Sequence, residues 1–183
     1  MPKRLAFAYG RAQVIGRTLM VVVFVAILVV LLAASPSFPV LTVALIGAVL
    51  AGYFLLFAVS PLLTEHWITR SRLILRQGWY FRAVIPFADI ESISAADDTV
   101  RGRVPLGIHR PTGHPTLFVT GGRTNLVSVR LRRPRRFWQA FGLSATEIIF
   151  DVNDRDRLLA AVGERQGSLA PVQAHSTDSQ LRD

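Results

Sequence analysis

The densest concentration of chemically capable side chains is the segment VRLRRPRRFW, residues 129–138. It carries five arginines within seven positions: Arg130, Arg132, Arg133, Arg135 and Arg136. Guanidinium groups form paired hydrogen bonds with phosphate or carboxylate oxygens, so the segment could bind nucleic acid or anionic phospholipid headgroups. It could equally be the solvated positive face of a folded domain. The choice among these interpretations depends on where the segment lies in the molecule.

Other side chains with catalytic or metal-binding chemistry are few and isolated. His109 and His114 are five positions apart, but no carboxylate or cysteine nearby completes a metal site. Asp97 and Asp98 are adjacent in a loop, where neighbouring carboxylates rarely converge on one substrate atom. Asp89 is expected to cap a turn or to pair with an arginine. The sequence therefore predicts a protein that is not an enzyme and has no catalytic, cofactor-binding or metal-binding residue.

The composition combines strong basic charge with a high apolar content. The 183 residues carry a formal charge of +9, and 51% of them are apolar. A basic protein usually binds a polyanion. Here the apolar residues are concentrated in the first third of the chain, and no array of base-stacking aromatic residues accompanies the arginines. Both observations favour a membrane surface over nucleic acid as the source of phosphate.

Two uncharged apolar segments indicate transmembrane helices. Residues 18–34 and residues 40–59 contain no charge and are apolar on all sides, and about 20 such residues cross a bilayer core. Val14 and Ile15 can extend the first segment past Arg17, whose long side chain can reach the interface. The SPSFP segment between the two predicts a tight turn. Residues 18–60 are therefore expected to form a membrane-spanning hairpin, since the remaining chain is too short to bury two such helices in a soluble core.

The charges around this hairpin predict its orientation. Basic residues without any acidic residue precede the first segment, and further arginines follow the second. The positive-inside rule then places both termini of this multi-pass chain in the cytoplasm, with residues 1–17 forming a basic N-terminus. A cleaved signal peptide is the rival interpretation, because residues 33–35 are small. Pro36 directly after the cut fits that interpretation poorly.

The second apolar segment carries two further features. Small residues gather on one of its faces, where helices can approach closely, namely Gly47, Ala48, Ala51 and Gly52. This face is expected to pack on the first segment, on another protomer or on another membrane protein, although such pairs are common in membrane helices. His66 follows the segment and is expected at the interface beside Trp67.

From residue 64 onward the pattern changes to short strands and turns. Alternating apolar residues predict strands over residues 66–78, 79–86, 87–93, 116–121, 125–132 and 147–152. Trp79, Phe81, Ala83 and Ile85 are expected to face the core. Residues 95–115 are rich in Gly, Pro and charge and are expected to form a long loop that could hold one short strand. The pattern predicts a mainly β or α+β domain.

Two helical segments are predicted near the end of this domain. Residues 134–142 are typical of one or two helical turns, because Pro suits the first helical position and Gly the exit. A longer helix follows Asn153, a plausible N-cap. Leu158, Ala161 and Val162 are expected to pack on the core. The aromatic residues Phe137, Trp138 and Phe141 are also expected to pack on the core, with the bilayer surface as the less favoured alternative. The domain is expected to span residues 64–167 and to be followed by a disordered tail at residues 168–183.

The first strands of this domain resemble those of bacterial pleckstrin-homology-like domains. The matching positions are Trp67, Ile68, Thr69, Arg72, Leu73, Leu75, Gly78, Ile85, Pro86, Phe87, Asp89, Ile90 and Ile93. The final strand and helix, residues 148–162, are also similar to that family, whereas residues 95–115 match no part of it. The resemblance implies an antiparallel barrel or sandwich closed by a C-terminal helix. Two spans ahead of such a domain are a familiar arrangement in small bacterial membrane proteins.

The expected function is that of an interaction module in the inner membrane, because folds of this shape bind lipid, peptide and protein partners alike. The cytoplasmic domain would contact a protein partner or anionic lipid headgroups. The alternative is an accessory subunit of a transport or envelope enzyme complex that docks through its transmembrane hairpin. A solvated face explains the five arginines more simply than specific headgroup binding does. If the domain binds lipid, substitution of the five arginines should abolish its affinity for liposomes. If the chain is a complex subunit, substitution of Gly47 and Gly52 should matter and substitution of the arginines should not.

Overall fold

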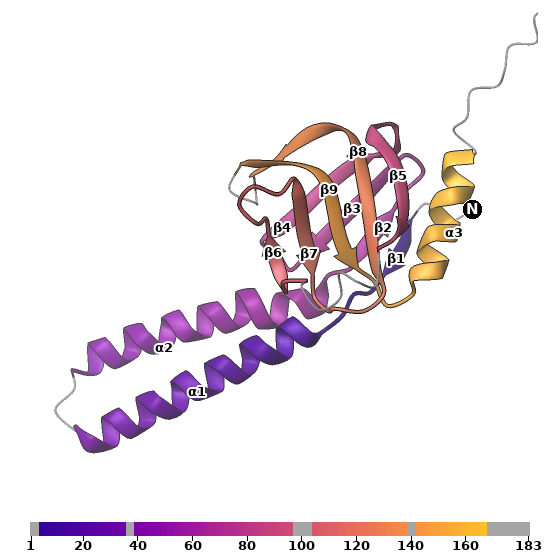
Figure 1. Cartoon of the computed structure of the whole chain (residues 1–183). Coiled ribbons are helices and arrows are strands. Elements are labelled where there is room, and N and C mark those ends of the chain that lie inside the picture. The colour runs from indigo at the N-terminus through magenta and orange to yellow at the C-terminus, as the bar shows by residue number, and fades with distance from the viewer. Residues whose placement is uncertain (1–3, 36–38, 97–103, 139–141, 168–183) are drawn as a thin grey trace, which may run out of the picture.

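Two long helices project from a β domain (Figure 1). The computed structural model describes residues 4–35, 39–96, 104–138 and 142–167. The first helix is α1 (Ala12–Ala34). The second is α2 (Val40–Phe54), which continues into the π-helical turn η1 (Leu55–Val59) and the 3-10 turn η2 (Ser60–Leu63). Both helical stretches are long and apolar enough to cross a membrane. The first helix extends past Arg17, in agreement with the expected extension through Val14 and Ile15, and begins at Ala12.

The side chains of α1 and α2 are mostly exposed, and the β domain does not cover them. Gly47, Ala48, Ala51 and Gly52 are all exposed, and a Cβ atom on either glycine would meet nothing within 4 Å. The small-residue face therefore does not pack against α1 in this structure. Its packing on another protomer or membrane protein stays a prediction. The apolar surface left open on both helices is of the kind that a membrane or a protein partner covers.

The first sheet contains a strand from before α1. Its order is β1-β2-β3-β4, from β1 (Leu5–Phe7), β2 (His66–Ile68), β3 (Arg72–Gln77) and β4 (Phe81–Pro86), and all pairs are antiparallel. Because β1 pairs with β2, the helical hairpin is an insertion within the domain. The expected boundary at residue 64 leaves this strand out. A three-residue strand is too short to show alternation in the sequence.

The expected strand at residues 66–78 is divided into β2 and β3. The chain bends between them, where the Arg72 N–H donates to Thr69 Oγ1 at 3.1 Å. At the other end, Gly78 has a φ of +62° and opens the β3–β4 turn. This turn carries Trp79 outward with 61% of its surface exposed, so the prediction that Trp79 faces the core is wrong. Phe81, Ala83 and Ile85 are buried as predicted.

The second sheet has the order β5-β8-β9-β7-β6. The 3-10 turn η3 (Phe87–Asp89) leads into it, and its strands are β5 (Ile90–Ala95), β6 (Gly107–His109), β7 (Thr116–Thr120), β8 (Leu126–Phe137) and β9 (Leu143–Asp151). β9 lies between β7 and β8, and it runs parallel to β7 and antiparallel to β8. The β7–β9 pair is thus an exception to the expected antiparallel arrangement. The link between β7 and β8 must cross the end of β9.

β8 is longer than predicted and occupies residues 134–137, where helical turns were expected, whereas residues 139–141 of that expected segment lie outside the described residues. From the Arg130–Glu147 pair to the Arg135–Ala145 pair, β8 advances five residues while β9 advances two. This wide bulge accommodates Pro134, which has no N–H for a regular ladder. Phe137 is buried as predicted, but Trp138 is 88% exposed instead of packed on the core. Phe141 lies outside the described residues.

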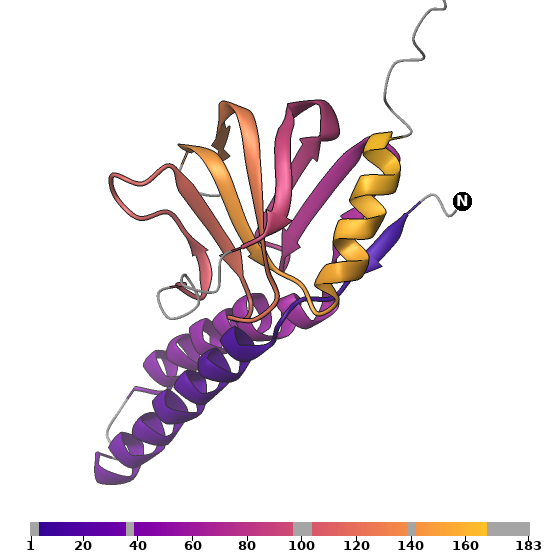
Figure 2. The same ribbon diagram turned by 45° about the vertical axis from the view of Figure 1, so that its right-hand side comes forward.

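Helix α3 (Arg155–Gly167) closes one side of the domain. Leu158, Ala161 and Val162 are buried in the main core, as predicted. Asp154, and not Asn153, caps the helix, since its Oδ1 accepts the Arg157 N–H at 3.2 Å. Figure 2 shows α3 beside β1. The structure thus agrees with the coarse prediction of a helical hairpin with an α+β domain. The predicted tail at residues 168–183 lies outside the described residues.

Candidate functional site

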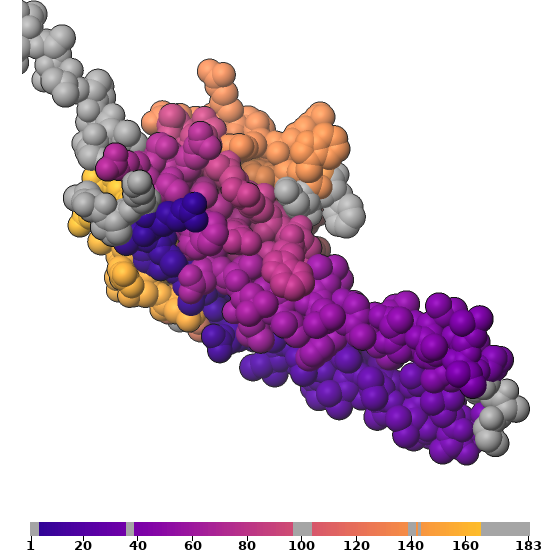
Figure 3. All heavy atoms as spheres, turned by 180° about the vertical axis from the view of Figure 1, so that it is seen from behind, coloured from indigo at the N-terminus to yellow at the C-terminus, as the bar shows by residue number. Residues whose placement is uncertain are grey.

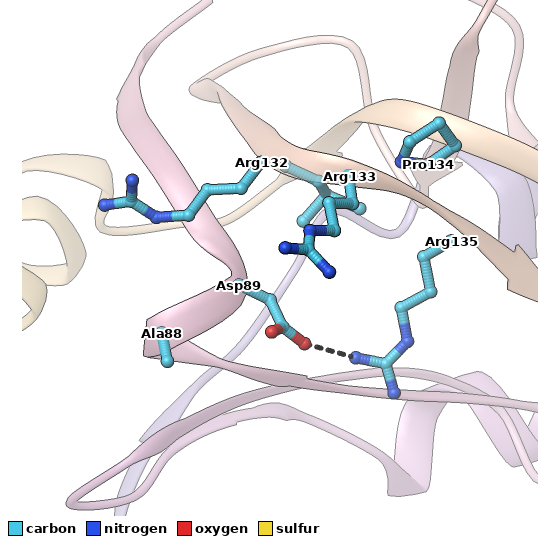
Figure 4. Close-up of a pocket in the computed structure, with 7 residues that line it drawn as sticks. Ala88, Asp89, Arg132, Arg133, Pro134 and Arg135 are labelled. Carbon is cyan, nitrogen blue, oxygen red and sulfur yellow. Dashed lines mark hydrogen bonds and ion pairs between the residues drawn. The ribbon is translucent and has the colours of Figure 1, made fainter.

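A basic groove lies between η3 and the bulge of β8 (Figure 4). Its volume is about 440 Å³, and its walls are Ala88, Asp89, Leu131, Arg132, Arg133, Pro134 and Arg135. Figure 4 shows the guanidinium of Arg135 directed toward Asp89, with Arg133 beside it and Arg132 extending away from the two. The groove therefore brings three of the five clustered arginines together with one carboxylate.

The sequence creates this groove through two interruptions of regular structure. β5 pairs with β8 only as far as the Ile90–Leu131 pair, so the following residues of β8 have no strand partner on that side. On the opposite wall, Phe87 is buried and its N–H donates to the Ser71 carbonyl at 2.9 Å. These contacts fix η3 and leave Asp89 exposed next to the bulge.

The electrostatic balance of the groove is positive. Arg135 Nη1 lies 3.3 Å from Asp89 Oδ2, in a pair whose side chains are 38% and 55% exposed. The predicted pairing of Asp89 with an arginine is confirmed. An ion pair this exposed stabilises the fold by about 1 kcal/mol at most. Among the described residues, neither Arg132 nor Arg133 forms an ion pair, so their charges are available to an anion from solvent.

Arg130 and Arg136 lie outside the groove. Arg130 is an exposed residue of the β8–β9 pairing and stands in register with Glu147. The Glu147 carboxylate instead accepts hydrogen bonds from the Ser128 hydroxyl at 2.7 Å and the Thr116 hydroxyl at 2.8 Å. Arg136 pairs in register with Ser144, beyond the bulge. The five arginines are therefore one basic segment but not one binding surface.

The residues that line the groove favour anion binding over catalysis. Its walls contain guanidinium, carboxylate and aliphatic groups, with no hydroxyl, imidazole or amine among the lining residues. Guanidinium groups match phosphate oxygens in charge and geometry. Asp89 is exposed and already paired with Arg135, so it has neither the burial nor the free position of a general acid or base.

A second, smaller cavity gathers the two loop histidines. It has a volume of about 270 Å³ and is lined by Pro105, His109, Pro111, His114, Thr116 and Phe118. Two imidazoles alone are fewer than a metal site requires. No group of three or more metal-ligating side chains occurs in the part of the chain that the structure describes.

A buried polar network joins the domain to the helices, and it was not predicted from the sequence. The Asp151 carboxylate at the end of β9 accepts the N–H groups of Gly10 and Gly121, both at 2.6 Å. Gly121 belongs to the link that crosses β9, and Gly10 lies two residues before the start of α1. Burial raises the pKa of Asp151 to about 6, although the N–H donors oppose this shift. We call this network the junction. Its residues are Tyr9, Gly10, Gln13, His66, Gln77, Gly121 and Asp151.

Tyr9 and Gln13 extend the junction to both ends of the hairpin. The Tyr9 hydroxyl donates to the Pro61 carbonyl at 2.8 Å and lies 2.8 Å from Thr64 Oγ1. The Gln77 amide of β3 donates to Gln13 Oε1 on α1, and also to the Thr120 carbonyl at 2.9 Å. Strands β3 and β7 are thereby attached to the first turn of α1.

His66 is fully enclosed beside this network. Its ring stacks on Tyr9 with centroids 4.9 Å apart and meets the edge of Phe150 at 5.3 Å, and its Nδ1 accepts the Arg76 N–H at 3.1 Å. Burial lowers the pKa of His66 to about 3, so the imidazole is neutral at physiological pH. The prediction of an interfacial histidine is wrong, because β2 turns this side chain inward.

Comparison of the chain with protein-family models, with curated proteins and with solved structures finds no match, so the fold and the geometry of these sites carry the functional argument.

Proposed function

We propose that this chain is a non-enzymatic bacterial inner-membrane protein whose β domain is an interaction module for phosphate-bearing anionic lipid headgroups. Two helices of sufficient length and apolarity support membrane insertion. The basic residues flanking them support cytoplasmic termini. Two sheets with a terminal helix support a pleckstrin-homology-like domain, from which the parallel β7–β9 pair and the early strand β1 are departures.

The groove carries this proposal. Three arginines line it with a single carboxylate, and the guanidinium groups of Arg132 and Arg133 have no ion pair among the described residues. A surface that is merely solvated needs no such convergence, and interspersed acidic residues would lower its self-repulsion. A domain tethered to a membrane has anionic headgroups within reach, and each basic group near them contributes about 1 kcal/mol.

Lipid retention by the full chain tests this proposal. The protein is purified in a neutral detergent doped with equal amounts of zwitterionic and anionic phospholipid, and native mass spectrometry counts the bound lipids. The triple variant Arg132→Gln, Arg133→Gln, Arg135→Gln should lose most of the preference for anionic lipid. The variant Arg70→Gln, Arg82→Gln, Arg123→Gln removes the same charge from exposed positions and should retain that preference. Equal losses in both variants would show that anionic lipid responds to the overall positive charge and not to the groove.

A role as an accessory subunit is the second candidate. The observation in its favour is the exposed small-residue face of α2, where Gly47 and Gly52 leave open space beside the helix. Close helix packing against another chain would use this space. Replacing both glycines with leucine should then abolish association with a membrane partner while lipid retention stays unchanged, as pull-down from solubilised membranes would show.

A further inference from the structure

The end of β8 combines exposed basic and aromatic side chains. We call residues 132–138 the tip. Phe137 is buried and fixes the backbone, whereas the next residue, Trp138, is 88% exposed. The tip also carries Arg132, Arg133, Arg135 and Arg136, and no acidic residue. Figure 3 shows that the orange β8–β9 segment protrudes from the surface of the domain.

A second exposed tryptophan indicates where the bilayer boundary lies on this domain. Trp79 is 61% exposed, and its backbone N–H donates to Ser60 Oγ at 3.1 Å, at the domain end of the second helix. The neighbouring Tyr80 ring packs on Phe57 with centroids 5.0 Å apart, and the Tyr80 hydroxyl accepts a hydrogen bond from Arg17 at 3.0 Å. Trp, Tyr and Arg at the end of an apolar helix are typical of the headgroup level of a membrane.

The tip and the helices extend from the junction in different directions. At one end of the β8–β9 ribbon, Leu126 pairs with Asp151 of the junction, and at the other end Phe137 pairs with Leu143. In Figures 1 and 2 this far end lies above and to the left of the junction, whereas the helices run downward to the left. The ribbon therefore carries the tip sideways from the domain end of the helices, where the surface of a bilayer would lie.

We propose that the tip docks onto the same bilayer that holds α1 and α2, with Trp138 in the interfacial layer and the arginines of the tip on anionic headgroups. This inference rests on the proposed function and deepens it, because it names the bilayer surface as the source of the phosphates. The domain then contacts the membrane at two places, the β3–β4 turn and the tip. Tethering by the helices makes the second contact intramolecular, so weak individual interactions are sufficient.

The chemistry of the tip favours a bilayer over a protein partner. An indole ring is amphipathic and is enriched at the membrane interface. There its apolar ring contacts lipid and its N–H forms hydrogen bonds with headgroups or water. Charges of a single sign around it suit a surface that presents many equivalent phosphates. Removal of three arginines should weaken docking on the order of 100-fold, because each contributes about 1 kcal/mol near an anionic surface.

Fluorine NMR of the full chain in lipid nanodiscs tests this inference. 5-Fluorotryptophan labels the three tryptophans, Trp67, Trp79 and Trp138, whose signals are assigned from single Trp→Phe variants. A phospholipid spin-labelled near its headgroup then broadens the signals of residues at the interface. In discs with anionic lipid we expect broadening of Trp138 and Trp79, with Trp67 as the reference. In neutral discs, or in the Arg132→Gln, Arg133→Gln, Arg135→Gln variant, Trp138 should sharpen while Trp79 stays broad.

Two outcomes would overturn the inference, and they can be told apart from failure of the proposed function. If Trp138 resembles Trp67 in every disc while the groove still retains anionic lipid in detergent, the groove binds headgroups but the tip does not dock. If Trp138 is broadened equally in neutral and anionic discs, docking does not depend on anionic headgroups. If the unsubstituted chain shows neither docking of Trp138 nor a preference for retaining anionic lipid, the proposed function is rejected as well.

Discussion

The junction and the tip lie at opposite ends of the β8–β9 ribbon and treat polar groups in opposite ways. At the junction the polar side chains are buried, and most of their polar atoms are bonded within the chain: Asp151 accepts two N–H groups, and Tyr9 and Gln13 bind the segments on either side of the helices. Gln77 Oε1 and His66 Nε2 have no hydrogen-bond partner among the described residues. At the tip the charges are exposed, of one sign and largely unpaired among the described residues. Buried, satisfied groups specify a structure, whereas exposed, unsatisfied charges are available to a partner.

This difference separates residues that hold the domain on its helices from residues that contact something else. Substitutions at the junction should change stability, and substitutions at the tip should change binding. The boundary between the two classes falls within β8, where Phe137 is buried and Trp138 is exposed.

Phe137 and Trp138 give the largest expected contrast between neighbours. Phe137→Ala should lower the free energy of unfolding by about 3–5 kcal/mol, because it leaves a cavity in the core. Trp138→Ala should change it by about 0.5 kcal/mol or less, because the side chain is 88% exposed. Denaturant unfolding of the full chain in neutral detergent, followed by circular dichroism, measures both. Equal destabilisation by the two variants would mean that Trp138 is packed, against the present account.

Gly10 provides the sharpest test of the junction. A Cβ atom there would lie 2.7 Å from Asp151 Oδ2 and 2.8 Å from Gly122 Cα. Gly10→Ala should therefore destabilise the domain by about 3 kcal/mol. The matched control is Gly163→Ala on α3, where a Cβ meets nothing within 4 Å and helix propensity gains about 1 kcal/mol. Unchanged stability of Gly10→Ala would show that Gly10 does not pack against the Gly121–Gly122 link.

His66 and Asp151 should act on stability in opposite directions as the pH falls. The pKa of His66 is lowered from 6.5 to about 3 on folding, so the unfolded state takes up the proton first and acidification below pH 6.5 destabilises the fold. The pKa of Asp151 is raised from 3.8 to about 6, so acidification between pH 6 and 4 stabilises the fold. Each group contributes about 1.4 kcal/mol per pH unit at most.

Single variants separate these two contributions. Relative to the wild type between pH 6 and 4, Asp151→Asn should lose stability more steeply on acidification. His66→Gln should lose it less steeply, each slope differing by about 1 kcal/mol per pH unit. The comparison uses slopes, because each substitution also changes stability at neutral pH. Parallel curves for all three proteins would show that neither group is buried as described.

The smallest expected effect belongs to the Arg135–Asp89 ion pair. Asp89→Asn should change the free energy of unfolding by about 0.5 kcal/mol or less, because both side chains are well exposed. The same variant should strengthen retention of anionic lipid, since it removes the only carboxylate among the groove residues. Weaker retention would indicate that Asp89 orients Arg135 for binding.

Much of the fold is visible in the sequence because long or strongly patterned elements dominate it. The two uncharged segments predict α1 and α2, and the alternation around Val127, Val129 and Leu131 predicts the first half of β8. Pro134 led to the wrong prediction of helical turns, because only the register with β9 shows that a bulge can accommodate it. β1 is too short to show a period.

The candidate site was predicted in part. The arginine cluster is evident from its spacing, but the separation of Arg132, Arg133 and Arg135 from Arg130 depends on where β5 ends and β8 bulges. The junction could not be predicted, since its members are single polar residues far apart in the sequence. Asp151 and Gly10, for example, are 141 positions apart. No local pattern marks such a pair.

Photocrosslinking in native-like membranes tests the central claim most directly. The full, unsubstituted chain is reconstituted with an anionic phospholipid that carries a photoreactive group in its headgroup, and peptide mapping locates the adducts. We expect adducts on residues 132–138 beyond those beside the helix ends, and far fewer with a zwitterionic photoreactive lipid. Adducts spread evenly over exposed arginines such as Arg70, Arg82 and Arg123, with no enrichment at the tip, would contradict the account and make the arginine segment an ordinary solvated face.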